Sequence, residues 1–163
     1  MRFPAIYLLH GIRGSPEGSV KKIQDAIEPQ NRGVKFVRPL LPHHDPKSPP
    51  EKSVEFLKKL QIPQDSLLIG VSLGGLAAAK LQEESRPDLH VICISSATMF
   101  GELKLNRKMA KRVSFYSSSD EVIADRVNNW PQLSESYDLP WLTHDTDTHL
   151  DKLAELIQKY IFQ

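Results

Sequence analysis

The stretch that decides the fold runs from Ser66 to Gly75 and reads SLLIGVSLGG. A run of large apolar residues stops at Gly70, and a single serine, Ser72, follows among glycines. A short apolar run bounded by glycine is typical of a buried strand, and the small residues that follow (GGLAAAK) can pack a helix closely against a sheet. The stretch therefore predicts a strand over 66–70, a tight turn at Ser72 and a helix over 73–84.

The same alternation of short apolar runs and longer helical segments continues along the chain. Further strands are expected at 5–9, 34–37, 89–95 and 113–116, with a weak sixth at 139–142. Helices are expected between residues 15 and 29 and over 51–60, 122–133 and 150–162, with a short helical piece over 102–108. Continuous apolar strands are buried on both faces, and intervening helices require a parallel sheet. The predicted fold class is α/β, a three-layer sandwich.

Length and charge limit the possible functions. A chain of 163 residues without a repeat or long linker is expected to form one domain, residues 1–163. Its 21 basic and 20 acidic residues give no reason to expect a nucleic-acid or membrane partner. The single cysteine, Cys93, excludes an internal disulfide framework and reads as a buried structural thiol. The N-terminal apolar run is too short for a signal peptide, so a cytoplasmic protein is expected.

The glycines around Ser72 have the spacing of a nucleophile elbow. Gly70 and Gly74 stand two residues before and two after the serine, in a G-x-S-x-G pattern between a strand and a helix. Small neighbours let the two arms of the turn close, and the N-terminus of the next helix can face a developing oxyanion. The alternative is a glycine-rich helix start with a capping serine, but the strand before and the helix after favour the elbow.

A serine nucleophile needs a base that is oriented by a third group, and in this architecture the order is nucleophile, acid, histidine. Asp120 ends the segment VSFYSSSD, and His149 ends THDTDTH directly before the last helix. Both should lie at the sheet edge that carries Ser72. We therefore expect Asp120 as the acid and His149 as the base.

Other residues compete for these roles. Glu121 and Asp125 are rivals of Asp120, which could also serve as a helix N-cap. His144 is the rival of His149; it is the less favoured because it stands near the weak sixth strand rather than directly before the helix. Either histidine could also be an ordinary loop residue.

Two further segments bear on the site. In LLHGIRGS the backbone N–H of Ile12 is the expected partner of the Leu73 N–H in an oxyanion hole, and His10 is expected to be structural. In LPHHDP, residues 43–45 are competent metal ligands, but adjacent histidines on an extended segment point in opposite directions. We expect no metal there, and this loop should border the substrate pocket. The basic segment KLNRKMAKR reads as solvated surface, with docking of an acidic partner as the alternative.

Together, LLHGIRG, GVSLGG, SSSDEV and the histidine before the last helix resemble the α/β-hydrolase superfamily over nearly the whole chain. The resemblance implies a serine hydrolase with Ser72 as nucleophile, Asp120 as acid and His149 as base. It also implies an oxyanion hole made by the amides of Ile12 and Leu73. It implies neither a metal nor a cofactor.

The chain departs from the superfamily in two expected ways. The usual first antiparallel hairpin is not expected before the strand that carries HG, and the segment between 95 and 113 is too short for a cap domain. A narrower resemblance is to small lidless serine hydrolases of the retinoblastoma-binding type. The short sheet raises the chance that two copies pair at an edge as a homodimer.

The expected activity is hydrolysis of a small carboxylic ester through an acyl-enzyme, with a small acyl compound as the substrate. A thioesterase or peptidase with the same three residues is one alternative. A non-catalytic partner-binding protein on the hydrolase fold is the other.

Overall fold

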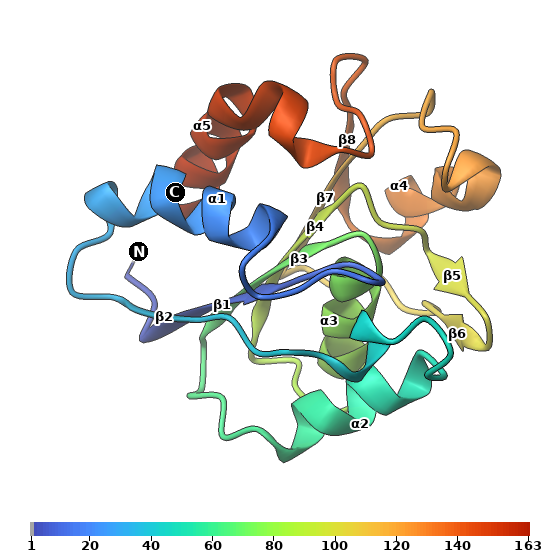
Figure 1. The fold of residues 1–163 in the computed structure, drawn as a ribbon, viewed down its shortest axis with the longest axis horizontal. Coiled ribbons are helices and arrows are strands. Elements are labelled where there is room, and N and C mark those ends of the chain that lie inside the picture. Colours follow the sequence, from blue (N-terminus) through green and yellow to red (C-terminus); the bar gives the residue numbers. More distant parts are fainter. Residues whose placement is uncertain (1) are drawn as a thin grey trace.

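Six parallel strands form the central sheet of the computed structural model, which describes residues 2–163 (Figure 1). Their spatial order is β2-β1-β3-β4-β7-β8. The strands are β1 (Ala5–Leu9), β2 (Lys35–Val37), β3 (Leu67–Val71), β4 (His90–Ile94), β7 (Arg112–Tyr116) and β8 (Glu135–Asp138). Because all six run the same way, the loops after their carboxyl ends gather at one edge of the sheet, which is where ligands bind in open α/β sheets.

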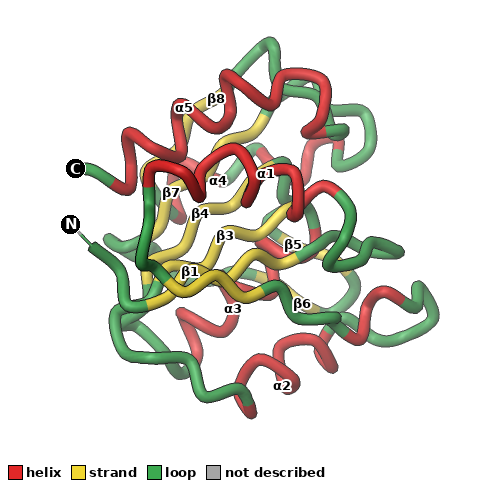
Figure 2. The backbone as a smooth tube through the Cα atoms, turned by 60° about the vertical axis from the view of Figure 1, so that its left-hand side comes forward, coloured by secondary structure: helices red, strands yellow, loops and turns green. Residues whose placement is uncertain are grey.

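Helices cover both faces of the sheet. In Figure 1, α1 (Ser19–Ile27) and α5 (Leu150–Ile161) lie on one side, and α2 (Glu51–Lys59) and α3 (Leu73–Glu84) on the other. Figure 2 shows the same three layers from another direction. The short helix α4 (Trp130–Leu133) lies next to β8. The remaining helical turns are the 3₁₀ segments η1 (Glu28–Gln30), η2 (Pro42–His44), η3 (Ala124–Val127) and η4 (Thr146–His149).

The period of two along each strand divides the apolar residues between two cores. In β1, Ile6 and Leu8 belong to the core under α1 and α5, whereas Ala5, Tyr7 and Leu9 belong to the core under α2 and α3. All five are buried, and all five residues of β3 and β7 are buried as well. Burial on both faces is the reason that these strands appear in the sequence as continuous apolar runs.

The predicted three-layer α/β sandwich is confirmed, and between β4 and β7 the chain makes only a small hairpin rather than a cap domain. This hairpin is β5 (Met99–Phe100) and β6 (Leu103–Lys104), so the short helical piece expected over 102–108 was wrong. Gly101, with φ +57°, makes the turn that sends the chain back.

Three other element boundaries differ from prediction. The sixth strand is β8, not 139–142. The prediction missed it because this edge segment is polar and largely exposed and has no apolar run. The helix expected over 122–133 is broken into η3 and α4. The first helix begins at Ser19, since residues 15–18 form a turn closed by the Gly18 N–H on the Ser15 carbonyl.

β2 and β8 are the two edge strands of the sheet, and the homodimer stays a prediction. Across residues 2–163, no helix has both the length and the apolar character that a membrane span requires.

Candidate active site

Ser72 occupies a strained turn between β3 and α3. Its backbone has φ +54° and ψ −123°, a conformation that costs a non-glycine residue about 1–3 kcal/mol and persists only where the surroundings enforce it. Two contacts hold it in place: the Ser72 N–H donates to the Ile94 carbonyl at 2.8 Å, and the Ser96 hydroxyl donates to the Ser72 carbonyl at 2.7 Å. The tight turn predicted at Ser72 is therefore present.

The glycines of G-x-S-x-G are required by close backbone approach. A Cβ atom at Gly74 would collide with the carbonyl oxygen of Leu9, and one at Gly70 would collide with the backbone nitrogen of Gly75. These contacts bring α3 against the ends of β1 and β3. Because the turn between β3 and α3 closes this tightly, the Ser72 side chain lies at the carboxyl edge of the sheet.

Three side chains meet at that edge in a continuous hydrogen-bonded chain. The Ser72 Oγ lies 3.1 Å from His144 Nε2, and His144 Nδ1 lies 2.9 Å from Asp120 Oδ2. The three residues come from the loops after β3, β8 and β7 respectively. The Asp120 side chain is 1% exposed and that of His144 is 27% exposed, so the carboxylate is shielded while the imidazole reaches the cleft.

Asp120 uses its two carboxylate oxygens for different tasks. Oδ2 accepts from His144, and Oδ1 accepts from the backbone N–H groups of Val122 at 2.9 Å and Ile123 at 3.3 Å. The helix N-cap expected as the alternative is not formed, because the N-cap position of η3 is Ile123 and not Asp120. The two N–H groups belong to the turn before η3, and they fix the orientation of the carboxylate that contacts His144.

His149 does not lie in this chain of contacts. The prediction that His149 lies beside Ser72 is wrong, because the histidine between Ser72 and Asp120 is His144. His149 is the last residue of η4 and stands immediately before α5, with its ring edge-on to Trp141 at a centroid distance of 5.7 Å. The physical reason is the position of β8. Because that strand ends at Asp138, the loop beyond it crosses the sheet edge around His144, six residues before the first residue of α5.

Serines at the end of β4 support the histidine loop as well as the elbow. The Ser95 hydroxyl donates to the carbonyl of Thr143, the residue before His144, at 3.2 Å. Ser95 itself has φ +51°. Sequence reasoning missed this contact and that of Ser96. The only available signal was the position of both serines directly after a buried strand.

The hydrogen-bond pattern fixes the roles of the imidazole nitrogens. When Asp120 is ionised it can only accept, so His144 Nδ1–H donates to it, and in a neutral imidazole Nε2 then accepts from the Ser72 hydroxyl. A serine hydroxyl beside an acceptor nitrogen, with a carboxylate behind it, is the arrangement that allows proton removal during nucleophilic attack.

The predicted oxyanion-hole residues flank Ser72. Leu73 supplies the first amide of α3, which belongs to the four N–H groups that a helix leaves without an internal partner. Ile12 lies in the loop after β1, within a turn closed by the Gly14 N–H on the Gly11 carbonyl at 3.0 Å. Arg13 in that turn has φ +61°. A Cβ at Gly11 would be 3.2 Å from the Ser72 Cβ, so this loop lies against the serine.

Buried histidines hold the loop that carries Ile12. His43 Nε2–H donates to the His10 carbonyl at 2.7 Å, and His43 Nδ1 accepts from the Ser53 hydroxyl at 2.8 Å. The Leu41 N–H donates to His10 Nε2 at 2.9 Å, and His10 Nδ1–H donates to the Gly11 carbonyl at 2.7 Å. Burial lowers the pKa of His43 to about 4 and also lowers the pKa of His10. The Leu41 N–H requires an acceptor at His10 Nε2, so that ring is neutral, and both rings hold the loop in place, as the structural interpretation of His10 expects.

The LPHHDP loop is tied to this network. Both ring nitrogens of His43 have protein partners, whereas His44 and Asp45 are exposed. Within residues 2–163, no three His, Cys, Asp or Glu side chains are grouped to hold a metal ion. The loop contacts the site indirectly, since the Arg13 N–H donates to the His43 carbonyl at 3.1 Å.

Two cavities meet at Ser72 and His144. The larger, of about 540 Å³, lies between the 10–15 loop and the start of α1. The smaller, of about 80 Å³, is apolar and lies over the start of α3. Ile12 and Val122 border both cavities. The site thus offers two unequal spaces on the two sides of one hydroxyl.

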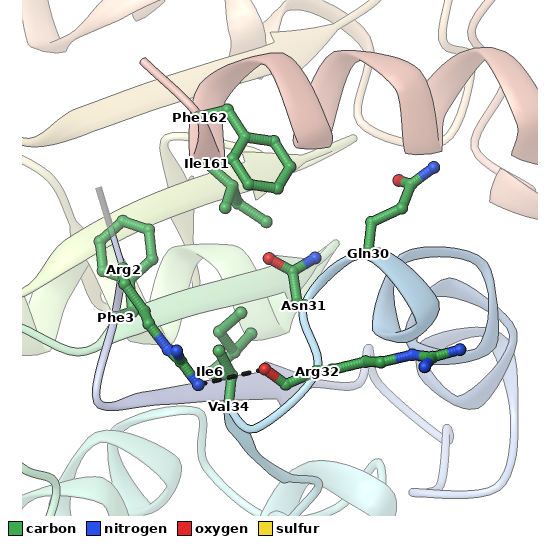
Figure 3. Close-up of a pocket in the computed structure, with 9 residues that line it drawn as sticks. All are labelled: Arg2, Phe3, Ile6, Gln30, Asn31, Arg32, Val34, Ile161 and Phe162. Carbon is green, nitrogen blue, oxygen red and sulfur yellow. Dashed lines mark hydrogen bonds between the residues drawn. The ribbon is translucent and has the colours of Figure 1, made fainter.

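A third cavity lies at the opposite, amino edge of the sheet. Figure 3 shows that Arg2, Asn31, Arg32 and Phe162 surround it, with the Arg2 guanidinium donating to the Arg32 carbonyl at 3.1 Å. Its volume is about 190 Å³. Its lining holds no serine, cysteine, histidine or carboxylate, so it offers no nucleophile.

Solved structures share this architecture. A ferulic-acid complex of Est1E from Butyrivibrio proteoclasticus is 16% identical, with 99% of this chain and 89% of that chain covered and a TM-score of 0.71. MGS-MChE2, an α/β hydrolase from a lagoon-sediment metagenome, is 15% identical, with 98% of this chain and 91% of that chain covered and a TM-score of 0.74. A pyrethroid hydrolase from Sphingobium faniae is 15% identical over 96% of each chain, with a TM-score of 0.64. These similarities show the α/β-hydrolase fold.

The narrower resemblance to the retinoblastoma-binding type finds no support among these structures. No curated protein sequence matches the chain significantly. The profile of one family, described as Uncharacterised protein family (UPF0227), matches residues 5–151. The chain therefore belongs to the UPF0227 family and has the α/β-hydrolase fold.

Proposed function

We propose that the protein is a serine hydrolase that cleaves a small carboxylic ester, with Ser72 as nucleophile, His144 as base and Asp120 as the orienting acid. The observation that carries the proposal is the unbroken chain of contacts from the Ser72 hydroxyl through His144 to Asp120. A partner-binding protein has no need of a strained serine aimed at an imidazole. The esterases among the structural neighbours agree with this chemistry.

In the proposed reaction, His144 Nε2 removes the hydroxyl proton as Ser72 Oγ attacks the ester carbonyl carbon. The resulting oxyanion is stabilised by the N–H groups of Ile12 and Leu73. His144 then gives the proton to the leaving alcohol, and water hydrolyses the acyl-enzyme with the same base. Asp120 keeps Nδ1 protonated and stabilises the imidazolium. Each oxyanion donor is worth about 10²–10³ in rate, and the nucleophile about 10⁶.

The substrate in this proposal is a small acyl compound in an aqueous compartment. The buried, unpaired Cys93 suits the reducing cytoplasm. The larger cavity beside Ser72, of about 540 Å³, is within the size range of small-molecule sites, which favours a small ester over a folded protein substrate.

A fluorophosphonate probe tests the assignment of Ser72. The wild-type protein should react covalently and lose activity on p-nitrophenyl butanoate, whereas Ser72→Ala should neither react nor turn over. Ser85→Ala is the matched control, because this exposed serine lies at the far end of α3. Labelling of Ser72→Ala at the wild-type rate would remove Ser72 from the site. A thioester or amide preferred over the matched ester would assign the same machinery to a thioesterase or peptidase.

A further inference from the structure

The smaller cavity beside Ser72 is built from apolar side chains of three segments. Leu73 and Leu76 come from the first turn of α3, Ala97 and Phe100 from the segment after β4, and Ile123 from the turn that follows Asp120. With Ser72 and His144 on its wall, the cavity opens directly onto the reacting hydroxyl. An apolar space at that position matches a hydrocarbon chain attached to the carbonyl carbon.

The two cavities differ in size and lining, and this difference indicates which cavity suits the acyl half of an ester and which suits the alcohol half. The leaving alcohol must depart while the acyl group stays bound to Ser72, and the 540 Å³ cavity gives a wide exit. The 80 Å³ cavity is narrow and lined by aliphatic and aromatic carbon, so it can hold the acyl chain during the lifetime of the acyl-enzyme.

The size of the small cavity limits the chain. One water-sized group needs roughly 10–15 Å³ of such space, so the cavity takes about five to eight non-hydrogen atoms. We propose that this cavity is the acyl site, that it admits chains of about two to six carbons, and that Phe100 and Arg126 form the wall that limits their length. This inference rests on the proposed function.

Arg126 is fixed as part of that wall. Its guanidinium lies 5.9 Å from the centroid of the Phe100 ring, close enough for a cation–π contact. Nε donates to the Ile123 carbonyl at 3.2 Å, and Nη2 donates to the Val122 carbonyl at 3.1 Å. A side chain with these three contacts cannot swing aside cheaply to admit a longer chain.

A series of p-nitrophenyl esters tests the acyl site. We expect kcat/KM to rise by about fourfold per methylene while the chain still fits, from acetate towards hexanoate, and to fall at least tenfold at decanoate. Phe100→Ala and Arg126→Ala should each raise the decanoate-to-butanoate ratio at least tenfold. Arg32→Ala, at the amino edge of the sheet, should leave the ratio unchanged.

A filling substitution tests the same wall in the opposite direction. Ala97→Leu should lower hexanoate turnover at least tenfold relative to acetate, so the inference does not depend on the stability of the alanine variants. Fluorophosphonate titration of Ser72 in every variant separates the two proposals. If the probe labels Ser72 normally but the wild type hydrolyses decanoate as well as butanoate, the acyl-site proposal is wrong and the serine-hydrolase proposal stands. Absence of labelling in the wild type would overturn the proposed function and, with it, this inference.

Discussion

Replacing His43 should change how the stability of the protein depends on pH. The ring is fully buried between the His10 carbonyl and the Ser53 hydroxyl, and desolvation lowers its pKa from 6.5 to about 4. The neutral form therefore stabilises the fold. This stabilisation is complete above pH 6.5 and is lost as the pH falls towards 4, because the unfolded chain takes up the proton first. A shift from 6.5 to about 4 corresponds to about 3 kcal/mol.

The assay is urea unfolding between pH 7 and pH 4, followed by tryptophan fluorescence, since Trp130 is buried and Trp141 half-buried. His43→Gln can still donate to the His10 carbonyl but does not titrate. The wild type should lose about 3 kcal/mol more unfolding free energy than His43→Gln over this range. His10 and His90, whose pKa values burial also lowers, remain in both proteins and contribute equally to a first approximation.

A parallel loss of stability in the wild type and in His43→Gln would refute the buried neutral ring. The same variant also reports on the site, because His43 holds the loop that carries Ile12. If His43→Leu is folded, it should lower kcat more than His43→Gln does, since leucine leaves the His10 carbonyl without its donor and the Ser53 hydroxyl without its acceptor. Each unpaired buried group costs about 1–3 kcal/mol.

Three further predictions concern the elbow, the acid and the thiol. Gly74→Ala should lower the free energy of unfolding by about 3 kcal/mol or more, because its Cβ would collide with the Leu9 carbonyl oxygen. Gly18→Ala, whose Cβ has ordinary contacts, should change the melting temperature little. Equal melting temperatures for the two variants would contradict this reasoning. Asp120→Asn should lower turnover by about 10³–10⁴ while the fold persists, and near-normal turnover would take the carboxylate out of the mechanism. Burial raises the pKa of Cys93 to about 12, so a thiol reagent should modify it only on unfolding; rapid reaction of the native protein would contradict its burial.

The parts of the fold that local sequence determines could be predicted closely. The strand, turn and helix around Ser72 follow from an apolar run, two glycines and a run of small residues, and the structure gives α3 the predicted limits of 73–84. The amphipathic helices α2 and α5 lie within a residue of prediction. In contrast, β8 consists of Glu, Ser, Tyr and Asp at an exposed edge, so neither alternation nor an apolar run marks it.

The same reason explains why one site residue was misplaced. Ser72 and Asp120 each come soon after a strand that is buried along its whole length, and such strands are visible in the sequence. His144 follows β8, the strand of the central sheet that has no apolar run, so the sequence did not show where His144 lies relative to the sheet edge. The contacts of Ser95 with Thr143 and of His43 with His10 depend on tertiary packing and have no local pattern.

The most direct test of the account compares turnover of p-nitrophenyl butanoate by His144→Ala and His149→Ala. The contact of His144 with both Ser72 and Asp120 predicts that His144→Ala loses at least 10³-fold in kcat and that added imidazole restores part of it. His149→Ala, which removes only packing against Trp141, should keep activity within a few-fold of the wild type. A nearly inactive His149→Ala beside an active His144→Ala would contradict the account.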